Sequence, residues 1–311
     1  MKPFRFGVSV WHAPSRAEWI AKARKIEDLG YSSLMVPDHL NERVAPIPAL
    51  ISAAEATKRI LVGTFVLNND LRHPVVLARE AAAVDLFTDG RLELGLGAGW
   101  NKPEYDQAGI TFDRGSIRVE RLAEAVVIIR RLLAGEQVTF AGRHYRVSGH
   151  TIGPLPVQKP HPPILIAGNG PRMLTLAAQQ ADIVGLSGMT LRRGGAEFDV
   201  SGWKGPAVDA CIALIRAAAG EERFARLELN ALVQRVVVSE DRRDAVEALM
   251  RAWPQLAAVD ILKSPYALVG TVDQIVEELC AHRARWGISY YVVHEPYMDA
   301  FAPVITRLAG K

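Results

Sequence analysis

An aspartate and a histidine stand side by side at Asp38-His39, directly after the short apolar segment 32–36. Histidine changes its charge most easily near neutral pH, so His39 is a candidate for general acid-base chemistry or for polarising a bound cofactor. The pair also fits a simpler role, in which Asp38 caps the next segment and His39 is a structural neighbour. A metal site is not expected, because no second histidine or carboxylate stands at a ligand spacing such as H-E-x-x-H.

A glycine-rich stretch follows another apolar segment and reads Gly97-Ala98-Gly99-Trp100. It lacks the third glycine of the dinucleotide-binding fingerprint, because Trp100 occupies that position. Without Cβ atoms, Gly97 and Gly99 would let the backbone approach a flat ring system, but crowding at a strand end would select the same residues. Trp100 would either stack on a ring or cover the core, and the sequence leaves both alternatives open.

A turn of small residues precedes a predicted helix and reads Gly168-Asn169-Gly170-Pro171-Arg172. The unpaired N–H groups and the dipole at a helix N-terminus attract a phosphate, and Arg172 would add positive charge. A tight turn with proline in the first helical position is the structural alternative. A second helix start, at Gly270-Thr271, competes for the phosphate-binding role, so the assignment is not unique.

These residues follow predicted strands that alternate with predicted helices along the chain. The predicted strands cover residues 4–10, 32–36, 60–67, 91–95, 162–167, 182–186, 227–238 and 289–293. Such alternation requires a parallel sheet with helices outside it, and eight units favour closure into a (β/α)8 TIM barrel. In these barrels function lies in the loops after the carboxyl ends of the strands, so the polar and glycine-rich strand ends should meet at one mouth.

Other predicted strand ends also carry polar or aromatic residues, namely Trp11-His12, Asn68, Ser187, Gln234-Arg235 and His294-Glu295. We expect one domain over residues 1–311, because no proline- or serine-rich linker divides the chain. The length beyond eight units lies in a hairpin near 136–148 and in long loops near 97–115 and 188–205. Arg192 and Arg193 in the last loop would either hold an anion or be solvated.

The overall composition is that of a globular protein, with 49% hydrophobic and 23% charged residues among 311. Its 37 basic and 34 acidic residues leave a dispersed net charge of +3, which predicts neither a nucleic-acid nor a membrane surface. Cys211 and Cys280 lack a C-x-x-C spacing, so we expect them to pack in a reducing cytoplasm. No apolar run approaches the roughly 18 residues that span a bilayer.

The order of the motifs resembles the bacterial luciferase-like flavin and deazaflavin oxidoreductases, particularly the branch that uses coenzyme F420. The motifs that carry the resemblance are Phe6-Gly7-Val8, residues 33–39, residues 57–64, Arg72-His73-Pro74, residues 90–100, Glu104-Tyr105 with Gly109, and residues 168–171. They run in order over residues 4 to 186, with weaker similarity from Val269 onward. Each motif is loose, whereas the ordered series is specific.

The resemblance implies that the barrel mouth binds F420, with the phosphate tail near the 168–170 turn and Asp38-His39 near the reactive edge of the ring. The family often has a non-proline cis peptide in its third strand that supports the ring, and the corresponding bond here is Phe65–Val66. The cofactor-binding residues implied in this way are Asp38, His39, Phe65, Val66, Asn68, Gly97, Ala98, Gly99, Trp100, Gly168, Asn169 and Gly170.

The implied activity is hydride transfer between the deazaflavin and a small organic substrate, with the redox chemistry carried by the cofactor. A monooxygenase that uses reduced FMN and oxygen on the same barrel is the alternative, and Asp38-His39 favours F420. A non-catalytic flavin-binding protein is a second alternative. Members of the family are frequently dimers, so a homodimer is an expectation, although no segment identifies an interface.

The chain departs from the family's sugar-phosphate dehydrogenase branch at two positions. Trp100 stands where that branch has glutamate, and Arg43 stands where it has tryptophan. A sugar-phosphate substrate is therefore not expected, and the acid that the branch's mechanism needs is missing. His39 is the expected catalytic residue, with His12 and His294 as further candidates for handling a proton.

Overall fold

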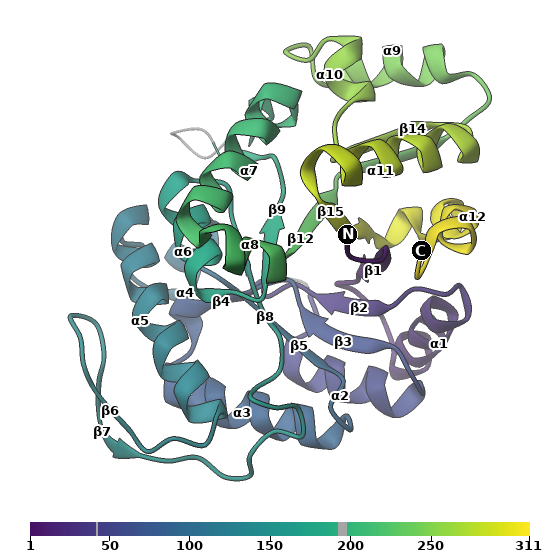
Figure 1. Ribbon diagram of the computed structural model, residues 1–311. Coiled ribbons are helices and arrows are strands. Elements are labelled where there is room, and N and C mark those ends of the chain that lie inside the picture. The colour runs from purple at the N-terminus through teal and green to yellow at the C-terminus, as the bar shows by residue number, and fades with distance from the viewer. Residues whose placement is uncertain (42, 192–197) are drawn as a thin grey trace.

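The computed structural model describes residues 1–41, 43–191 and 198–311. Its barrel strands are β1 (Arg5–Ser9), β2 (Ser33–Val36), β3 (Leu61–Thr64), β5 (Leu92–Gly97), β8 (Ile164–Ala167), β9 (Ile183–Leu186), β12 (Glu228–Val233) and β15 (Ile288–His294). Within the described residues these eight parallel strands pair in the order β3-β2-β1-β15-β12-β9-β8-β5, and β3 pairs with β5 to close the ring. The predicted (β/α)8 barrel is therefore confirmed (Figure 1).

The helices surround the barrel and connect successive strands. The outer helices are α1 (Arg16–Asp28), α2 (Pro46–Ala56), α3 (Pro74–Phe87), α5 (Gly115–Leu133), α6 (Pro171–Gln180), α7 (Gly205–Ala219), α8 (Glu221–Arg226), α11 (Val272–Trp286) and α12 (Met298–Leu308). Local sequence sets several of their ends. Ser15 caps α1 by accepting from the Glu18 N–H, and Gly287, with φ of 76°, ends α11 in the left-handed conformation.

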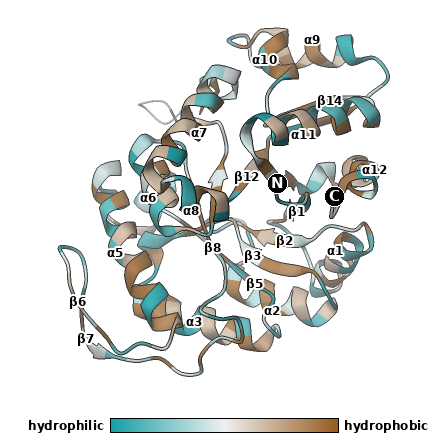
Figure 2. Cartoon of the chain, in the orientation of Figure 1, coloured by the Kyte–Doolittle hydropathy of each residue, from teal (hydrophilic) through white to brown (hydrophobic). Residues whose placement is uncertain are grey.

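The apolar core has two parts, one inside the barrel and one between strands and helices. The inner cluster comprises Met35, Leu165, Ile183, Tyr290 and Val292. The helices show both brown and teal in Figure 2, as expected where one face of each helix is buried. At the amino ends of the strands, Arg5 lies 2.7 Å from both Glu93 and Glu228, so a charged cluster fills this end of the barrel.

The predicted third strand, 60–67, is interrupted in the structure. β3 ends at Thr64, and a separate short strand, β4 (Leu67–Asn68), continues the pairing with β5. The peptide bond between Phe65 and Val66 is cis, as the family resemblance predicted. A short 3-10 helix, Asn69–Leu71, follows β4 and leads toward α3.

The predicted seventh strand, 227–238, is wrong in its second half. β12 ends at Val233, and Arg235–Val238 forms β13, which pairs with β14 (Ala267–Gly270) in a separate two-stranded sheet. The chain leaves the barrel because the N–H groups of Gln234 and Arg235 both donate to the Tyr266 carbonyl, at 2.8 and 3.3 Å. Helices α9 (Arg242–Ala252) and α10 (Ala258–Leu262) lie between β13 and β14 along the chain (Figure 1).

Segments outside the eight barrel units have secondary structure of their own. The hairpin consists of β6 (Val138–Ala141) and β7 (Arg146–His150), which extend away from the barrel (Figure 1). The 97–115 loop contains a short helix, α4 (Lys102–Ala108). The 188–205 loop contains the paired strands β10 (Thr190–Leu191) and β11 (Phe198–Asp199) and a 3-10 helix, Ser201–Trp203. Arg192 and Arg193, the candidate anion-binding residues, lie outside the described residues.

Candidate functional site

The carboxyl ends of the barrel strands bring Asp38 and Asn68 together at the mouth. Asp38 is buried, with a relative exposure of 7%, and forms an ion pair with Arg72. Its Oδ2 also accepts from the Asn68 backbone N–H at 3.1 Å. Both oxygens of this carboxylate are therefore occupied by the protein, and Asp38 fixes the relative positions of strands β2 and β4 rather than presenting an acid to a ligand.

His39 is paired with a carboxylate that the sequence analysis did not assign to the site. Its Nδ1 lies 2.8 Å from Glu104 Oε1 and 3.1 Å from Oε2. Glu104 comes from α4 and is 7% exposed, so the pair is shielded from solvent. Trp100 packs edge-on against the His39 ring, with 5.6 Å between ring centroids. Because Glu104 accepts from Nδ1–H when the imidazole is neutral, Nε2 is the nitrogen left to interact with a bound molecule.

Two opposing effects act on the protonation of His39. Burial lowers the pKa of His39 below its ordinary value, and the nearby Arg43 charge lowers it further, while the Glu104 carboxylate opposes both. The net direction is downward, which favours a neutral imidazole near pH 7. A neutral ring with a fixed tautomer accepts a proton at Nε2 and returns it, as general acid-base chemistry requires.

The glycines after β5 are explained by packing within the protein. A Cβ on Gly97 would lie 2.6 Å from Val66 Cγ2, and a Cβ on Gly99 would lie 2.0 Å from Tyr105 Oη. Gly99 also has φ of 75°, which favours glycine. Crowding at the strand end, one of the two alternatives from sequence, therefore accounts for both residues. Trp100 is 47% exposed and does not cover the core, so it remains available to a ligand.

The 168–170 turn lies at the ends of two neighbouring strands, β8 and β9. The Asn169 amide donates to Ser187 Oγ at 2.7 Å, and its oxygen accepts from the Ser187 and Gly188 N–H groups. Gly170 precedes α6 without a side-chain cap, and a Cβ built there would meet no atom within 4 Å. Among the described residues no side chain caps the start of α6, and because Pro171 carries no N–H, the N–H groups of Arg172 and Met173 are the ones that an anion could bind there.

The competing helix start at Gly270-Thr271 is already capped by the protein. Thr271 accepts from the Gln274 N–H at 3.3 Å, and the Gln274 side chain accepts from the Thr271 N–H at 3.0 Å. A Cβ on Gly270 would lie 2.2 Å from Gln274 Oε1, so this side chain fills the space beside the turn. The structure thus distinguishes two helix starts that the sequence could not tell apart. Of these two, the start of α11 is capped by the protein and the start of α6 is not.

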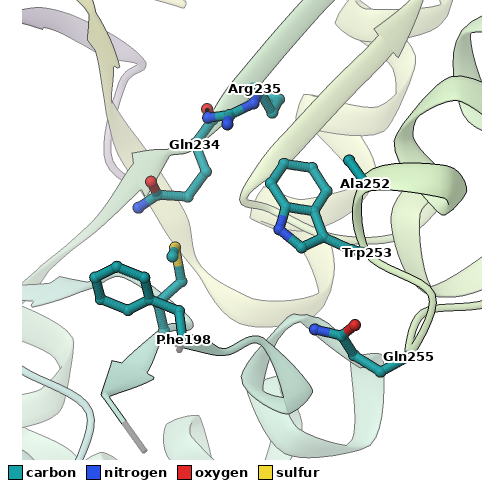
Figure 3. A pocket seen from close by; sticks show the side chains of 7 residues that line it. Phe198, Gln234, Arg235, Ala252, Trp253 and Gln255 are labelled. Carbon is teal, nitrogen blue, oxygen red and sulfur yellow. Dashed lines mark hydrogen bonds between the residues drawn. The ribbon is translucent and has the colours of Figure 1, made fainter. Parts of the chain in front are cut away.

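The ends of β12 and β15 form a different part of the mouth. The Trp11 and His294 rings pack edge-on with centroids 5.5 Å apart, and His294 Nε2 lies 3.4 Å from Gln234 Oε1. Arg235 follows Gln234, and its guanidinium lies over the Trp253 ring at 4.8 Å. Gln234, Arg235 and Trp253 lie around a pocket, which is drawn in Figure 3. The volume of this pocket is about 470 Å³. The pocket is lined by Met189, Phe198, Gln234, Arg235, Ala252, Trp253 and Gln255.

The two further proton-handling candidates have different environments. His294 is largely buried, and burial followed by the charges of Arg235 and Arg43 lowers its pKa to about 4. This ring is therefore neutral over the physiological range, and its Nδ1 has no hydrogen-bond partner among the described residues. His12 is exposed at the rim. Of the three histidines, His39 alone has a carboxylate partner within 4.0 Å among the described residues, which favours it as the proton-handling group.

Across residues 1–41, 43–191 and 198–311, no group of three or more His, Cys, Asp or Glu side chains is placed to hold a metal ion. Among the helices of those ranges, none is long and apolar enough to cross a membrane. The fold defines a (β/α)8-barrel protein, and its polar and glycine-rich strand ends meet at the mouth.

Comparison with known proteins identifies the family. The chain belongs to the luciferase-like monooxygenase family, whose model matches residues 2–290. It is 29% identical over 302 residues to an F420-dependent glucose-6-phosphate dehydrogenase of Nakamurella multipartita, a match that covers 92% of this chain and 84% of that one. The resemblance that the sequence motifs suggested is therefore confirmed.

Two other relatives extend the comparison. The chain is 34% identical over 185 residues to an F420-dependent hydroxymycolic acid dehydrogenase of Mycobacterium tuberculosis, a match that covers 57% of this chain and 51% of that protein. Among solved structures, the F420-dependent tetrahydromethanopterin reductase of Methanopyrus kandleri aligns over 99% of this chain and 98% of its own, with a TM-score of 0.76 and 18% identity. At that identity the likeness concerns the fold alone.

Proposed function

We propose that the protein is an F420-dependent oxidoreductase that transfers hydride between the deazaflavin and a small organic substrate. The observation that carries the proposal is the uncapped start of α6, which offers backbone N–H groups to a phosphate at the mouth. The F420-dependent relatives described above support the same cofactor. Asp38-His39 follows β2 at the same end of the barrel.

The residues of this half of the mouth fit a phosphate-bearing ring cofactor. Gly168, Asn169 and Gly170 would hold the phosphate, since nothing within 4 Å occupies the space a Cβ would take at Gly170. The part of the mouth in which we place the ring system is formed by Asp38, His39, Phe65, Val66, Asn68, Gly97, Ala98, Gly99 and Trp100. Because Val66 fills the space beside Gly97, we assign the contact with the ring there to the Val66 side chain rather than to the glycine backbone.

The protein's own contribution to the reaction is positioning and proton handling. When bound, the deazaflavin supplies the site that gives or accepts hydride. His39 Nε2 holds the proton that must be delivered to, or removed from, the substrate oxygen or carbon, while Glu104 fixes the ring through Nδ1. Trp100 and the buried Glu104 keep water from this side of the imidazole.

The setting we propose is the cytoplasm, with a small molecule as the partner. Cys211 and Cys280 are both unpaired, which suits a reducing compartment. The net charge of +3 is too small to favour a nucleic-acid partner. We propose one domain over residues 1–311, and the homodimer expected from the family is tested by sedimentation.

The test is a pair of fluorescence titrations, with F420 and with FMN, on the wild type and two charge variants. Gly170→Asp adds a side chain that can cap α6 itself and puts a negative charge where the phosphate would lie. Ser148→Asp adds the same charge on the exposed strand β7, away from the mouth. We expect saturable binding of F420 but not FMN, an affinity for F420 at least about tenfold lower in Gly170→Asp, and no change in Ser148→Asp.

Each alternative has its own outcome in this experiment. Saturable binding of FMN without binding of F420 would replace the proposal with the FMN-dependent monooxygenase. Tight F420 binding without turnover of any acceptor would support a non-catalytic flavin-binding protein. Thermal unfolding of Gly170→Asp is the folding control, and its midpoint should equal or exceed that of the wild type because the new carboxylate caps the helix.

A further inference from the structure

Two arginines at the mouth lie over indole rings on either side of His294. The Arg43 guanidinium lies 5.4 Å from the Trp11 ring centroid, and the Arg235 guanidinium lies 4.8 Å from that of Trp253. Arg43 follows β2 and Arg235 follows β12, with β1 and β15 between them in the barrel. Such stacking holds a guanidinium plane in a fixed orientation while its N–H groups remain available.

These two charges lack the carboxylate partners that other mouth arginines have. Arg72 is paired with Asp38, and Arg121 is paired with Asp70 at 2.7 Å. Within the described residues, neither Arg43 nor Arg235 makes an ion pair. Arg235 donates one hydrogen bond to the Gln234 carbonyl. The carboxylate whose charge raises the pKa of Arg43 is Glu104, and Glu104 is hydrogen-bonded to His39. This part of the mouth therefore carries an excess of positive charge.

His294 lies between the surroundings of the two arginines: its ring packs on Trp11, over which Arg43 lies, and its Nε2 lies 3.4 Å from Oε1 of Gln234, the neighbour of Arg235. Burial lowers the pKa of His294, and the charges of Arg235 and Arg43 lower it further. Both guanidinium groups are therefore close enough to His294 to disfavour a third positive charge beside them. An anion bound near this ring would be stabilised by both arginines at once.

The pocket beside Arg235 is the size of a small-molecule site and has an apolar wall. Its volume of about 470 Å³ falls within the range typical of ligand pockets. Met189, Phe198 and Trp253 supply apolar surface, whereas Gln234 and Arg235 are polar groups on one side (Figure 3). Phe198 also packs against Trp100, with ring centroids 5.8 Å apart, and Trp100 contacts His39. A chain of ring contacts thus connects Phe198 in the pocket lining with His39.

We propose that this pocket binds a substrate with an apolar body and an oxyanion, either carboxylate or phosphate, which Arg235 holds from within the lining and Arg43 from the adjoining end of β2, outside that lining. This inference rests on the proposed function, because it assigns the substrate class of the same mouth. The apolar body would lie against Phe198 and Trp253, and the oxyanion would receive guanidinium N–H groups in the bidentate geometry that arginine favours.

The position of the arginines separates them from the proposed cofactor phosphate. The open start of α6 follows β8, whereas Arg235 follows β12, and β9 lies between these two strands. Arg43 stands where the sugar-phosphate branch has tryptophan, which agrees with a different substrate.

The test is calorimetric binding of four compounds to the protein, with and without saturating F420. Phenylacetate and phenyl phosphate carry the oxyanion on an apolar body, methyl phenylacetate is the neutral analogue, and glucose 6-phosphate carries a polar body. The variants are Arg43→Gln and Arg235→Gln, with Arg146→Gln on the exposed strand β7 as a matched control. F420 affinity is measured separately for every variant.

We expect phenylacetate or phenyl phosphate to bind the wild type, and methyl phenylacetate not to bind. Arg43→Gln and Arg235→Gln should each lower the affinity for the anion by about tenfold or more, because each loses a charge-assisted hydrogen bond. Arg146→Gln should leave this affinity unchanged. F420 affinity should be the same in all variants. Arginine-dependent binding of the anion without F420 binding to the wild type would refute the proposed function and leave this pocket assignment intact.

Three results would overturn the inference. The first is an equal affinity of the wild type for phenylacetate and methyl phenylacetate, or an equal affinity for the anion in the wild type, Arg43→Gln and Arg235→Gln. The second is a parallel loss of F420 affinity in Arg43→Gln or Arg235→Gln, which would assign these arginines to the cofactor. The third is tighter binding of glucose 6-phosphate than of phenyl phosphate, which would exclude an apolar body.

Discussion

The two halves of the barrel mouth differ in the residue types that form them. After β4, β5 and β8 the mouth consists of glycines, amides and backbone N–H groups, and Arg72, which follows β4, is paired with Asp38 from the neighbouring end of β2. After β12, β15, β1 and β2 it consists of indoles, a histidine and two arginines without ion-pair partners among the described residues. A cofactor shared across a family can be held by backbone geometry, whereas a substrate is selected by side chains.

His39 lies where the two halves meet, so its removal is expected to have the largest effect. His39→Gln should lower kcat by about 10²- to 10⁴-fold, the usual contribution of a general acid or base. Glu104→Gln should cause a smaller decrease, because the imidazole keeps a hydrogen-bond partner but loses the charge that raises the pKa of His39. Steady-state kinetics with an apolar carboxylate that supports turnover measures both.

The matched control for these variants is His12→Gln, because His12 is exposed at the rim and should leave kcat unchanged. In Glu104→Gln the pH profile should shift toward lower pH, since the pKa of His39 falls when the carboxylate is removed. Equal losses in His12→Gln and His39→Gln, or an unshifted pH profile, would argue against His39 as the proton-handling residue.

Two glycines in the part of the mouth proposed for the cofactor should respond differently to substitution, because one is required for packing and the other is not. A Cβ on Gly95 would lie 2.0 Å from the Thr64 carbonyl oxygen, so Gly95→Ala should destabilise the fold by about 3 kcal/mol. Gly170→Ala should change stability little, because the added Cβ meets no atom within 4 Å and φ at this residue is −75°. Urea unfolding measures both, and similar losses in the two variants would contradict the packing assignment.

His294, which is largely buried in the part of the mouth proposed for the substrate, should make the free energy of unfolding depend on pH. The pKa of His294 in the folded state is about 4, below its unfolded value near 6.5, because burial and the charges of Arg235 and Arg43 disfavour protonation. Its contribution to stability is therefore full above pH 6.5 and is lost as pH falls toward 4. In His294→Gln, the decrease in unfolding free energy between pH 7 and 5 should be smaller by roughly 2 kcal/mol.

A second buried histidine provides the control for this pH dependence. His282, in α11, also has its pKa lowered to about 4 by burial, but it stacks on Trp286 outside the mouth. Phenylacetate should therefore reduce the acid-induced loss of stability in the wild type and in His282→Gln, and not in His294→Gln. The same ligand effect in all three proteins would show that His294 does not face the anion.

The secondary structure of the part of the mouth after β4, β5 and β8 was largely predictable from sequence, because short motifs encode it. Strand and helix periodicity predicted the barrel, and the resemblance predicted the cis bond at Phe65–Val66. The point at which the seventh strand leaves the barrel was not predictable, because Arg235–Val238 contains three valines, has the composition of a strand, and follows β12 after one residue. Its departure depends on the Tyr266 carbonyl, which belongs to a distant segment.

Contacts between distant residues explain what the sequence did not reveal about the site. His39 and Glu104 are 65 residues apart, and no spacing rule connects a histidine after one strand with a carboxylate on a short helix after another. Gln234-Arg235 was identified as a polar strand end, but its pocket depends on Trp253 and Phe198 from separate elements. The role of Gly97 was open from sequence because only the fold brings Val66 against it.

The division of the mouth is tested most directly by a crystal structure of the protein with F420 bound. We predict that the cofactor phosphate receives the N–H groups at the start of α6, that the ring lies between Val66 and His39, and that Arg43 and Arg235 do not contact the cofactor. A phosphate or carboxylate of F420 bound by Arg43 and Arg235, with the start of α6 empty, would contradict the account.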